Sequence, residues 1–189
     1  MKKFILATLL LSASALPAHA ADYVIDTKGA HAFIQFKISH LGYSFIIGRF
    51  NNFSGEFSYD EKNPGASKIT VDINPASIDS AHAERDKHLR GKDFFDVEKY
   101  TTAKFVSTSY TESAGGKAVL KGDLTLHGVT RNISIDVQQI GAGADPWGGY
   151  RRGFTGTTTL TLSDFGMNYN LGPSSKTVDM TLVVEGIKK

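Results

Sequence analysis

Cysteine is absent from the sequence, which excludes disulfide bonds, thiol nucleophiles and cysteine-ligated metal sites. An excess of one charge is also absent, because 21 lysine and arginine residues stand against 19 aspartate and glutamate residues. Domains that bind nucleic acid usually carry a clear basic excess, so we expect no nucleic-acid partner. The longest hydrophobic run lies within the first twenty residues.

Residues 1–20 have the three parts of a secretory signal peptide. Two lysines follow the first methionine, residues 4–16 are apolar but too short to span a bilayer, and the final Ala-His-Ala fits a cleavage site. We therefore predict that residues 1–20 are cleaved and that residues 21–189 form a single domain. The short basic signal and the lack of disulfides favour the periplasm of a Gram-negative bacterium.

Hydrophobic and polar residues alternate with period two along most of the remaining chain. The alternating segments lie near residues 32–39, 69–73, 104–109, 129–137, 154–162 and 178–184. This pattern is typical of antiparallel strands with one packed and one wet face. Glycine-rich turns separate the segments, so we predict an all-β sandwich or barrel.

Three segments interrupt the strand pattern. Residues 80–90 predict a short helix, with a serine as its cap and a glycine after its last residue. Residues 93–96 and 41–47 each predict a further helical turn. The pair Asn51-Asn52 predicts a bulge, which would change the residues that face inward after Phe50.

The polar residues form no recognisable catalytic or metal-binding pattern. Glu84 and His88 share one helix face, but a third ligand and the H-E-x-x-H spacing are missing, so we expect no metal. A G-x-S-x-G nucleophile motif is also missing, so we expect no catalytic residues. His40 has the same parity as Ile34 and Phe36, which leaves two interpretations open. It is either a buried histidine bonded to backbone or a residue at the mouth of a cavity.

Aromatic residues are abundant, and residues 42–57 alone contain five rings. The interior of an eight-stranded closed sheet is either filled by its own side chains or holds one small ligand. Ligand pockets are typically apolar and aromatic. The composition therefore leaves both a packed core and a lined cavity open. Trp147 likewise fits either a cavity rim or a cap on the core.

Five long segments have a specific pattern. They are HAFIQFKISHLGYS (31–44), GRFNNFSGEFSYD (48–60), HAERDKHLRGKDFFDVEKY (82–100), GDLTLHGVT (122–130) and DPWGGYRRGF (145–154). Together they resemble the YceI-like family of exported bacterial proteins, which are described as polyisoprenoid-binding. The resemblance implies a lipocalin-like antiparallel β-barrel of about eight strands with one or two short helices. It also implies a bound isoprenoid lipid as ligand, with no cofactor, metal or catalytic triad.

A barrel that holds such a ligand needs an apolar lining and a mouth that accepts a polar head group. We expect inward-facing residues to line the cavity: Ile34, Phe36, Ile38, Phe53, Phe57, Phe105, Leu124, Leu126 and Phe165. We expect seven residues near the barrel ends to form the mouth: His40, Tyr43, Phe45, Arg85, Asp93, Phe94 and Trp147.

The predicted function is a non-catalytic periplasmic carrier for a polyprenyl lipid, an isoprenoid quinone or a similar long-chain amphiphile. Transient contact with a membrane is compatible with this function, and a homodimer is an open alternative to a monomer. Two other interpretations are a periplasmic enzyme, with His40 or Asp93 as acid or base, and a stress-response protein that binds a fatty amide. A small outer-membrane barrel would need an apolar outer band, whereas the outward positions here are mostly polar.

Overall fold

The structure is a computed structural model that describes residues 20–189, so the predicted signal peptide lies outside the described residues apart from Ala20. The strands are β1 (Ala21–Ile25), β2 (Phe33–His40), β3 (Ser44–Phe50), β4 (Phe53–Tyr59), β5 (Lys68–Ile73), β6 (Ile78–Asp79), β7 (Ala103–Glu112), β8 (Lys117–Leu126), β9 (Val129–Ala144), β10 (Tyr150–Thr161) and β11 (Thr177–Lys188). The α-helix is α1 (Ala83–Arg90), and the short 3-10 turns are η1 (Pro64–Ala66), η2 (Pro75–Ser77), η3 (Ala114–Gly116), η4 (Leu162–Phe165) and η5 (Pro173–Ser175).

Eight of the strands close into an antiparallel barrel. Their order is β1, β4, β5, β7, β8, β9, β10 and β11, and β11 pairs back with β1. The strands β2 and β3 lengthen the barrel, because β2 continues β1 along β11 and β3 pairs along β2 before leading into β4. The predicted lipocalin-like barrel of about eight strands is therefore confirmed.

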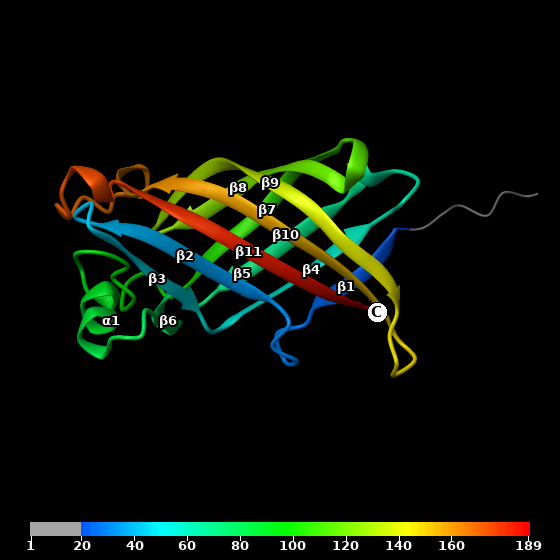
Figure 1. The fold of residues 1–189 in the computed structure, drawn as a ribbon, viewed down its shortest axis with the longest axis horizontal. Helices are drawn as coiled ribbons and strands as arrows, with labels where there is room; N and C mark the ends of the chain where they lie inside the picture. The colour runs from blue at the N-terminus through cyan, green and yellow to red at the C-terminus, as the bar shows by residue number, and fades with distance from the viewer. Residues whose placement is uncertain (1–19) are drawn as a thin grey trace, which may run out of the picture.

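The barrel has two different ends, which Figure 1 shows on the left and right. We call the left one the α1 end, where α1, the β2–β3 turn and η4 lie. We call the right one the terminal end, where the C-terminus and the β9–β10 turn lie. The interiors next to these ends differ in how completely side chains fill them.

At Asn51-Asn52, where a bulge was predicted, the structure instead has a break between two separate strands. Strand β3 ends at Phe50, which faces inward, and β4 starts at Phe53 with Phe57 also inward. The Asn51 amide donates to the Ser77 carbonyl at 3.1 Å, so this short break keeps its backbone bonded to the η2 segment. The break shifts the alternation by one residue, which is why Phe50 and Phe53 both belong to the interior.

The helical turn predicted for residues 41–47 was wrong. Leu41 and Gly42 have positive φ angles of 55° and 82°, so they reverse the chain in a tight hairpin. Strand β3 begins at Ser44, which is the partner of His40 in the register. Strand pairing with β2 therefore determines the local structure here and overrides the aromatic-rich local pattern.

The helix prediction for residues 80–90 was correct in type and in its end at Gly91, but not in its cap. His82 is the N-cap, and its Nδ1 accepts a hydrogen bond from the Arg85 amide at 3.2 Å. Ser80 instead donates its hydroxyl to the buried Asp86 carboxylate at 2.5 Å. Residues 93–96 form turns and not a second helix.

Side chains fill the interior near the α1 end. Phe36, Phe50 and Leu160 come from strands and are at most 9% exposed. Ile78 and Phe165 come from segments that cross this end, and they are 1% and 2% exposed. The crossing segments thus supply the side chains that complete this core.

Candidate ligand-binding cavity

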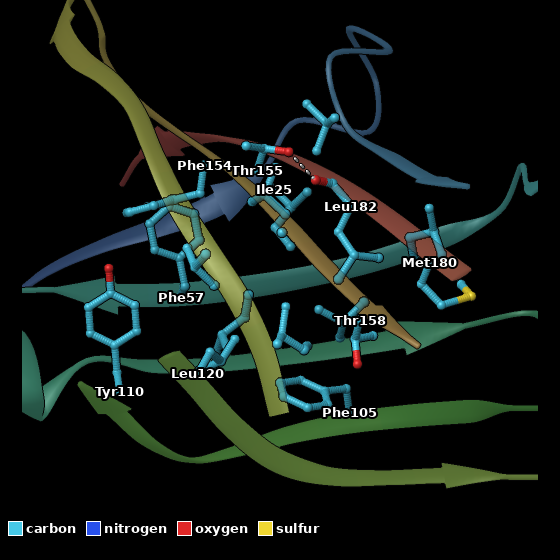
Figure 2. Close-up of a pocket in the computed structure, with 18 of the residues that line it drawn as sticks. Ile25, Phe57, Phe105, Tyr110, Leu120, Phe154, Thr155, Thr158, Met180 and Leu182 are labelled. Atoms are coloured by element: carbon cyan, nitrogen blue, oxygen red, sulfur yellow. Dashed lines mark hydrogen bonds between the residues drawn. The ribbon is translucent and has the colours of Figure 1, made fainter. Parts of the chain in front are cut away.

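A cavity occupies the interior between the packed core and the terminal end. Its empty volume is about 1160 Å³, including the part that is open to solvent. All eight strands of the ring contribute lining side chains, and Figure 2 shows many of them around the open space. One lining residue of each strand, in the order of the strands around the ring, is Ile25, Phe57, Ile69, Phe105, Leu120, Ile133, Phe154 and Met180. The lining is thus almost entirely aliphatic and aromatic.

Two large lining rings are held at the barrel wall by glycines of other strands. A Cβ atom on Gly122 would lie 2.3 Å from the Phe105 ring, and one on Gly186 would lie 2.3 Å from the Phe57 ring. Any other residue would therefore push these rings toward the centre of the barrel. Phe57 also stacks on Tyr23 with 4.7 Å between ring centroids. The aromatic rings consequently line the cavity without closing it.

A cluster of polar and aromatic side chains lies toward the terminal end of the barrel, and Tyr59 is its member that lines the cavity. The Arg152 side chain, only 3% exposed, stacks over the Tyr59 ring at 4.3 Å and donates hydrogen bonds to Glu61 and, at 3.4 Å, to the Tyr23 hydroxyl. The Tyr59 hydroxyl donates to Glu112 at 2.7 Å. Burial and then this contact with Glu112 raise the pKa of Tyr59, so its phenol is protonated at neutral pH.

Sequence reasoning missed this cluster. The signal that could have revealed it is the parity of β10, because Arg152 alternates with Gly153 and so faces the same side as Phe154. An arginine on the inward face of a strand needs an acidic partner, and Glu61 lies 91 residues away in sequence. A local pattern does not identify such a partner.

A network of ion pairs holds the loop between β1 and β2, on the outer side of the terminal end. Arg151 donates to Asp26 at 2.7 Å, to Glu185 at 2.5 Å and to Asp145 at 2.9 Å, and His31 Nδ1 lies 3.0 Å from Asp26. Burial alone would raise the pKa of Asp26, but hydrogen bonds from Arg151, His31 and the Gly29 amide lower it to about 2.

Asp26, His31 and Glu185 are also the residues of the described chain that lie close enough together to ligate a metal ion. The Arg151 guanidinium already takes the position of the cation between the two carboxylates. The cluster is therefore satisfied as an ion-pair network, and its chemistry gives no reason to place a metal there.

Comparison with known proteins identifies the family. Residues 23–186 match the YceI-like domain. The chain belongs to the YceI-like family. The UPF0312 protein of Shewanella sp. strain ANA-3 is 54% identical over 191 residues, with 100% of both chains covered. The family resemblance seen in the sequence is thus confirmed.

Solved structures share the YceI-like barrel. A Campylobacter jejuni YCEI protein is 29% identical with a TM-score of 0.72, covering 81% of this chain and 91% of that chain. Burkholderia cenocepacia BcnA is 22% identical with a TM-score of 0.75, covering 85% and 98%. A polyisoprenoid binding domain from Saccharophagus degradans is 17% identical with a TM-score of 0.64, covering 88% and 98%. At this low identity, the last two show the fold alone.

The structure divides the nine residues predicted to line the cavity of this YceI-like barrel into two groups. Five line it: Ile34, Phe53, Phe57, Phe105 and Leu124. The other four lie in or against the packed core near the α1 end: Phe36, Ile38, Leu126 and Phe165. All nine had been assigned to the interior, and the interior proved to be filled at one end and hollow at the other. Contact of the first group with a ligand stays a prediction.

The seven residues predicted for the mouth do not gather at one opening, and none of them lines the cavity. His40 is exposed and not inward, because it lies at the tip of the β2–β3 hairpin, beyond the closed ring. Tyr43 and Phe45 are also exposed on this hairpin. Trp147 is exposed at the opposite end, in the β9–β10 turn.

The remaining mouth residues belong to the structure around α1. Arg85 donates from Nε to the Ser80 hydroxyl at 2.7 Å, and Asp93 lies 3.0 Å from His88 Nε2. Phe94 is 6% exposed and packs on His88 and Tyr169. These contacts explain the three side chains as parts of the cover over the α1 end.

Among residues 20–189, the helices are all too short or too polar to cross a membrane.

Proposed function

We propose that this protein is a non-catalytic periplasmic binding protein that holds an isoprenoid chain, or a similar long-chain amphiphile, inside its barrel. The observation that carries this proposal is the hollow half of the interior, which is lined by aliphatic and aromatic side chains from every strand of the ring. Burial contributes about 0.8 kcal/mol per CH₂ group, so a polyprenyl or isoprenoid-quinone tail is retained without any chemical step.

The relatives support a ligand of this class. The Saccharophagus degradans domain with the same barrel is named for polyisoprenoid binding. An elongated apolar interior suits a flexible hydrocarbon chain better than a polar metabolite, since a polar group would lose its hydration without gaining partners. The predicted signal peptide supports a periplasmic site of action, where a lipid between two membranes needs a protein that covers its tail.

The exposed β2–β3 hairpin supports transient contact with a membrane. Tyr43, Phe45 and Ile47 are 88%, 63% and 63% exposed, and the Lys37 ammonium lies 5.0 Å from the Phe45 ring centroid. Aromatic and aliphatic side chains next to a cation are typical of segments that rest in a bilayer interface.

Lipid analysis of two matched variants tests the proposal. The full-length chain is expressed, the protein is purified without detergent, and an organic extract is examined by mass spectrometry. We expect an isoprenoid lipid at near-stoichiometric amount with the unaltered protein. Leu120→Lys places a charge in the cavity lining, so this variant should carry no lipid. Val119→Lys places the same charge on the outer face of the same strand, so this variant should still carry the lipid. Equal lipid content in the two variants would contradict the proposal.

Cell fractionation tests the location. We expect the protein in the fraction released by osmotic shock, with a mass that corresponds to residues 21–189. Protein that stays in the cytoplasm with residues 1–20 attached would show that the predicted signal peptide is wrong.

A further inference from the structure

The hollow part of the interior ends at one level of the barrel. On β10 and β11, the paired residues Thr158 and Met180 line the cavity, whereas the next inward pair toward the α1 end, Leu160 and Val178, does not. Figure 2 shows Thr158 and Met180 at one side of the open space and Tyr110 at the other. We call the layer of buried side chains that starts with Leu160 and Val178 the floor of the cavity.

Phe165 completes the floor from a segment that crosses the α1 end. It comes from η4, is 2% exposed and packs in one hydrophobic cluster with Ile34 and Leu124, which themselves line the cavity. The Phe36 ring lies against the barrel wall, because a Cβ atom on Gly48 would be only 2.3 Å from it. The Phe165 ring is therefore the part of the floor that no strand supplies.

Local contacts fix the position of Phe165. The His127 ring nitrogen Nδ1 lies 3.0 Å from the Phe165 carbonyl oxygen. Gly166 follows with a φ angle of 74°, and its amide donates to the Ser163 carbonyl at 3.0 Å. Glycine adopts this positive φ without strain, so the turn ends directly after Phe165. Because a turn holds the floor, the Phe165 side chain can be changed without altering a barrel strand.

The described side chains offer a polar head group no partner inside the cavity, since polar atoms contribute practically none of its surface. The hydroxyl oxygens of Tyr110 and Ser67 are buried in the wall without a protein partner and have almost no accessible surface. Lys68 has no ion-pair partner among residues 20–189, but its parity on β5 is outward, opposite to Ile69. A head group inside would lose its hydration without gaining hydrogen bonds.

The distance from the floor to the terminal end limits the length of tail that is buried. The lining includes both ends of β4, Phe53 and Tyr59, and this strand of seven residues is about 20 Å long. Strands of such barrels tilt by roughly 35–45°, so the depth is about 15 Å. An extended chain advances about 1.2 Å per bond, which gives about 5 Å for an isoprene unit with four bonds along the chain. The cavity therefore holds about three extended isoprene units.

From these observations we infer that the floor at Phe165 determines the length of tail that this protein binds: about three isoprene units are buried, and the head group stays outside the cavity. The inference rests on the proposed function and specifies it. Specificity then lies in the length of the apolar tail, and ligands with the same tail and different head groups bind with similar affinity.

A series of ligands with increasing tail length tests the floor. The protein, freed of lipid, is titrated with geraniol, farnesol, geranylgeraniol and geranylfarnesol, which have two to five isoprene units, by displacement of an apolar fluorescent dye. We expect the affinity to rise at least roughly tenfold from two to three units. Beyond three units it should change less than about threefold per unit, because further units find no apolar lining.

Two variants move the floor in opposite directions. Phe165→Ala removes a ring about as large as one isoprene unit, so the affinity should continue to rise up to four units. Phe94→Ala is its control, because Phe94 is also buried but lies in the cover over the α1 end and not in the lining. Met180→Trp raises the floor, so the affinity should level off at two units, and this variant tests the floor even if Phe165→Ala does not fold. Thr181→Trp, on the outer face of the same strand, is its control.

Ligands with one tail and different ends test the position of the head group. Farnesol, farnesyl phosphate and the hydrocarbon farnesene should bind the unaltered protein within about fivefold of one another at physiological ionic strength. An exposed cation such as Lys68 contributes no more than about this factor.

The outcomes separate this inference from the proposed function. Failure of every ligand to bind the unaltered protein would contradict the proposed function itself. An affinity that keeps rising by more than about threefold per unit through five units would overturn the floor while the proposed function stands, and so would a length dependence that neither Phe165→Ala nor Met180→Trp changes. A larger than fivefold difference among the three farnesyl ligands would overturn the inference that the head group stays outside.

Discussion

Phe165 and Phe154 are both phenylalanines of the barrel interior, but they lie in halves with different packing. Phe165 is 2% exposed and packs in the core near the α1 end. Phe154 lies on β10, lines the cavity and contacts the Phe57 ring edge-on at a centroid distance of 5.8 Å. The same type of residue thus fills one half of the barrel and lines an open space in the other.

The difference arises from the segments that cross the two ends. At the α1 end, the β5–β6 region and η4 insert Ile78 and Phe165 into the barrel, so the strand side chains meet a central apolar plug. At the terminal end, Arg152, Tyr59 and Glu61 form a polar cluster, and Tyr59 is the one of the three that lines the cavity. A hollow interior therefore depends on what the loops insert more than on the strands themselves.

The largest expected effect is the difference in stability when a phenylalanine of each half is replaced by alanine. Phe165→Ala should lower the free energy of unfolding by about 3–5 kcal/mol, because it opens a new void in a filled core. Phe154→Ala should cost about 2 kcal/mol or less, because it enlarges space that already exists. Urea unfolding of the lipid-free proteins measures both. Equal losses would show that the two halves do not differ in packing.

Insertion of a larger side chain tests the comparison in the opposite direction. Leu160→Phe in the packed half should destabilise the protein by about 1–3 kcal/mol, because no room remains. Ile133→Phe in the lining should cost less than about 1 kcal/mol, but it should weaken lipid affinity at least roughly tenfold, because the ring takes the place of two or more buried CH₂ groups. Unfolding and dye displacement on the same samples measure the two effects. Unchanged lipid affinity in Ile133→Phe would mean that the ligand lies elsewhere.

Acid should lower the stability of the protein by protonating Asp26 at the terminal end. Its pKa in the folded protein is about 2, below the value of 3.8 for an unperturbed aspartate. The stabilisation is therefore fully present above about pH 4 and is lost as the pH falls toward 2, with a size of about 1–2 kcal/mol because water screens part of it.

Asp26→Asn should remove this component of the pH dependence, as measured by thermal unfolding between pH 2 and 6. Asp179→Asn is the control, since its partner Lys37 is exposed and such pairs contribute little. A pH dependence in Asp26→Asn that matches that of the unaltered protein would contradict the role of the Arg151 network.

The smallest effect on stability is expected where aromatic rings lie outside both halves. Tyr43→Ser and Phe45→Ser on the β2–β3 hairpin should change the free energy of unfolding by less than about 0.5 kcal/mol, because the side chains are exposed. The fraction of the protein that sediments together with lipid vesicles should nevertheless decrease in both variants. Unchanged vesicle binding would exclude the hairpin as the membrane contact.

Much of the fold was predictable because period-two alternation is a local property. It identified Ile34 and Leu124 as inward residues. The change of alternation expected at Asn51-Asn52 agrees with the inward positions of Phe53 and Phe57, although a strand break and not a bulge produces it. The same argument failed for His40, since a strand keeps its alternation beyond the level where other strands enclose it. Parity predicts a direction, and only the surrounding strands determine whether that direction is an interior.

The sequence by itself determined an antiparallel all-β fold with an apolar interior, and its long motifs indicated the family and, through it, a barrel. The tertiary structure alone decided which half of that interior is hollow, that Arg152 pairs with Glu61 from 91 residues away, and that the Tyr110 hydroxyl is left without a partner. The physical reason is that alternation and turn preference act between near neighbours in the chain. Filling a volume and satisfying a hydrogen bond depend on residues that only folding brings together.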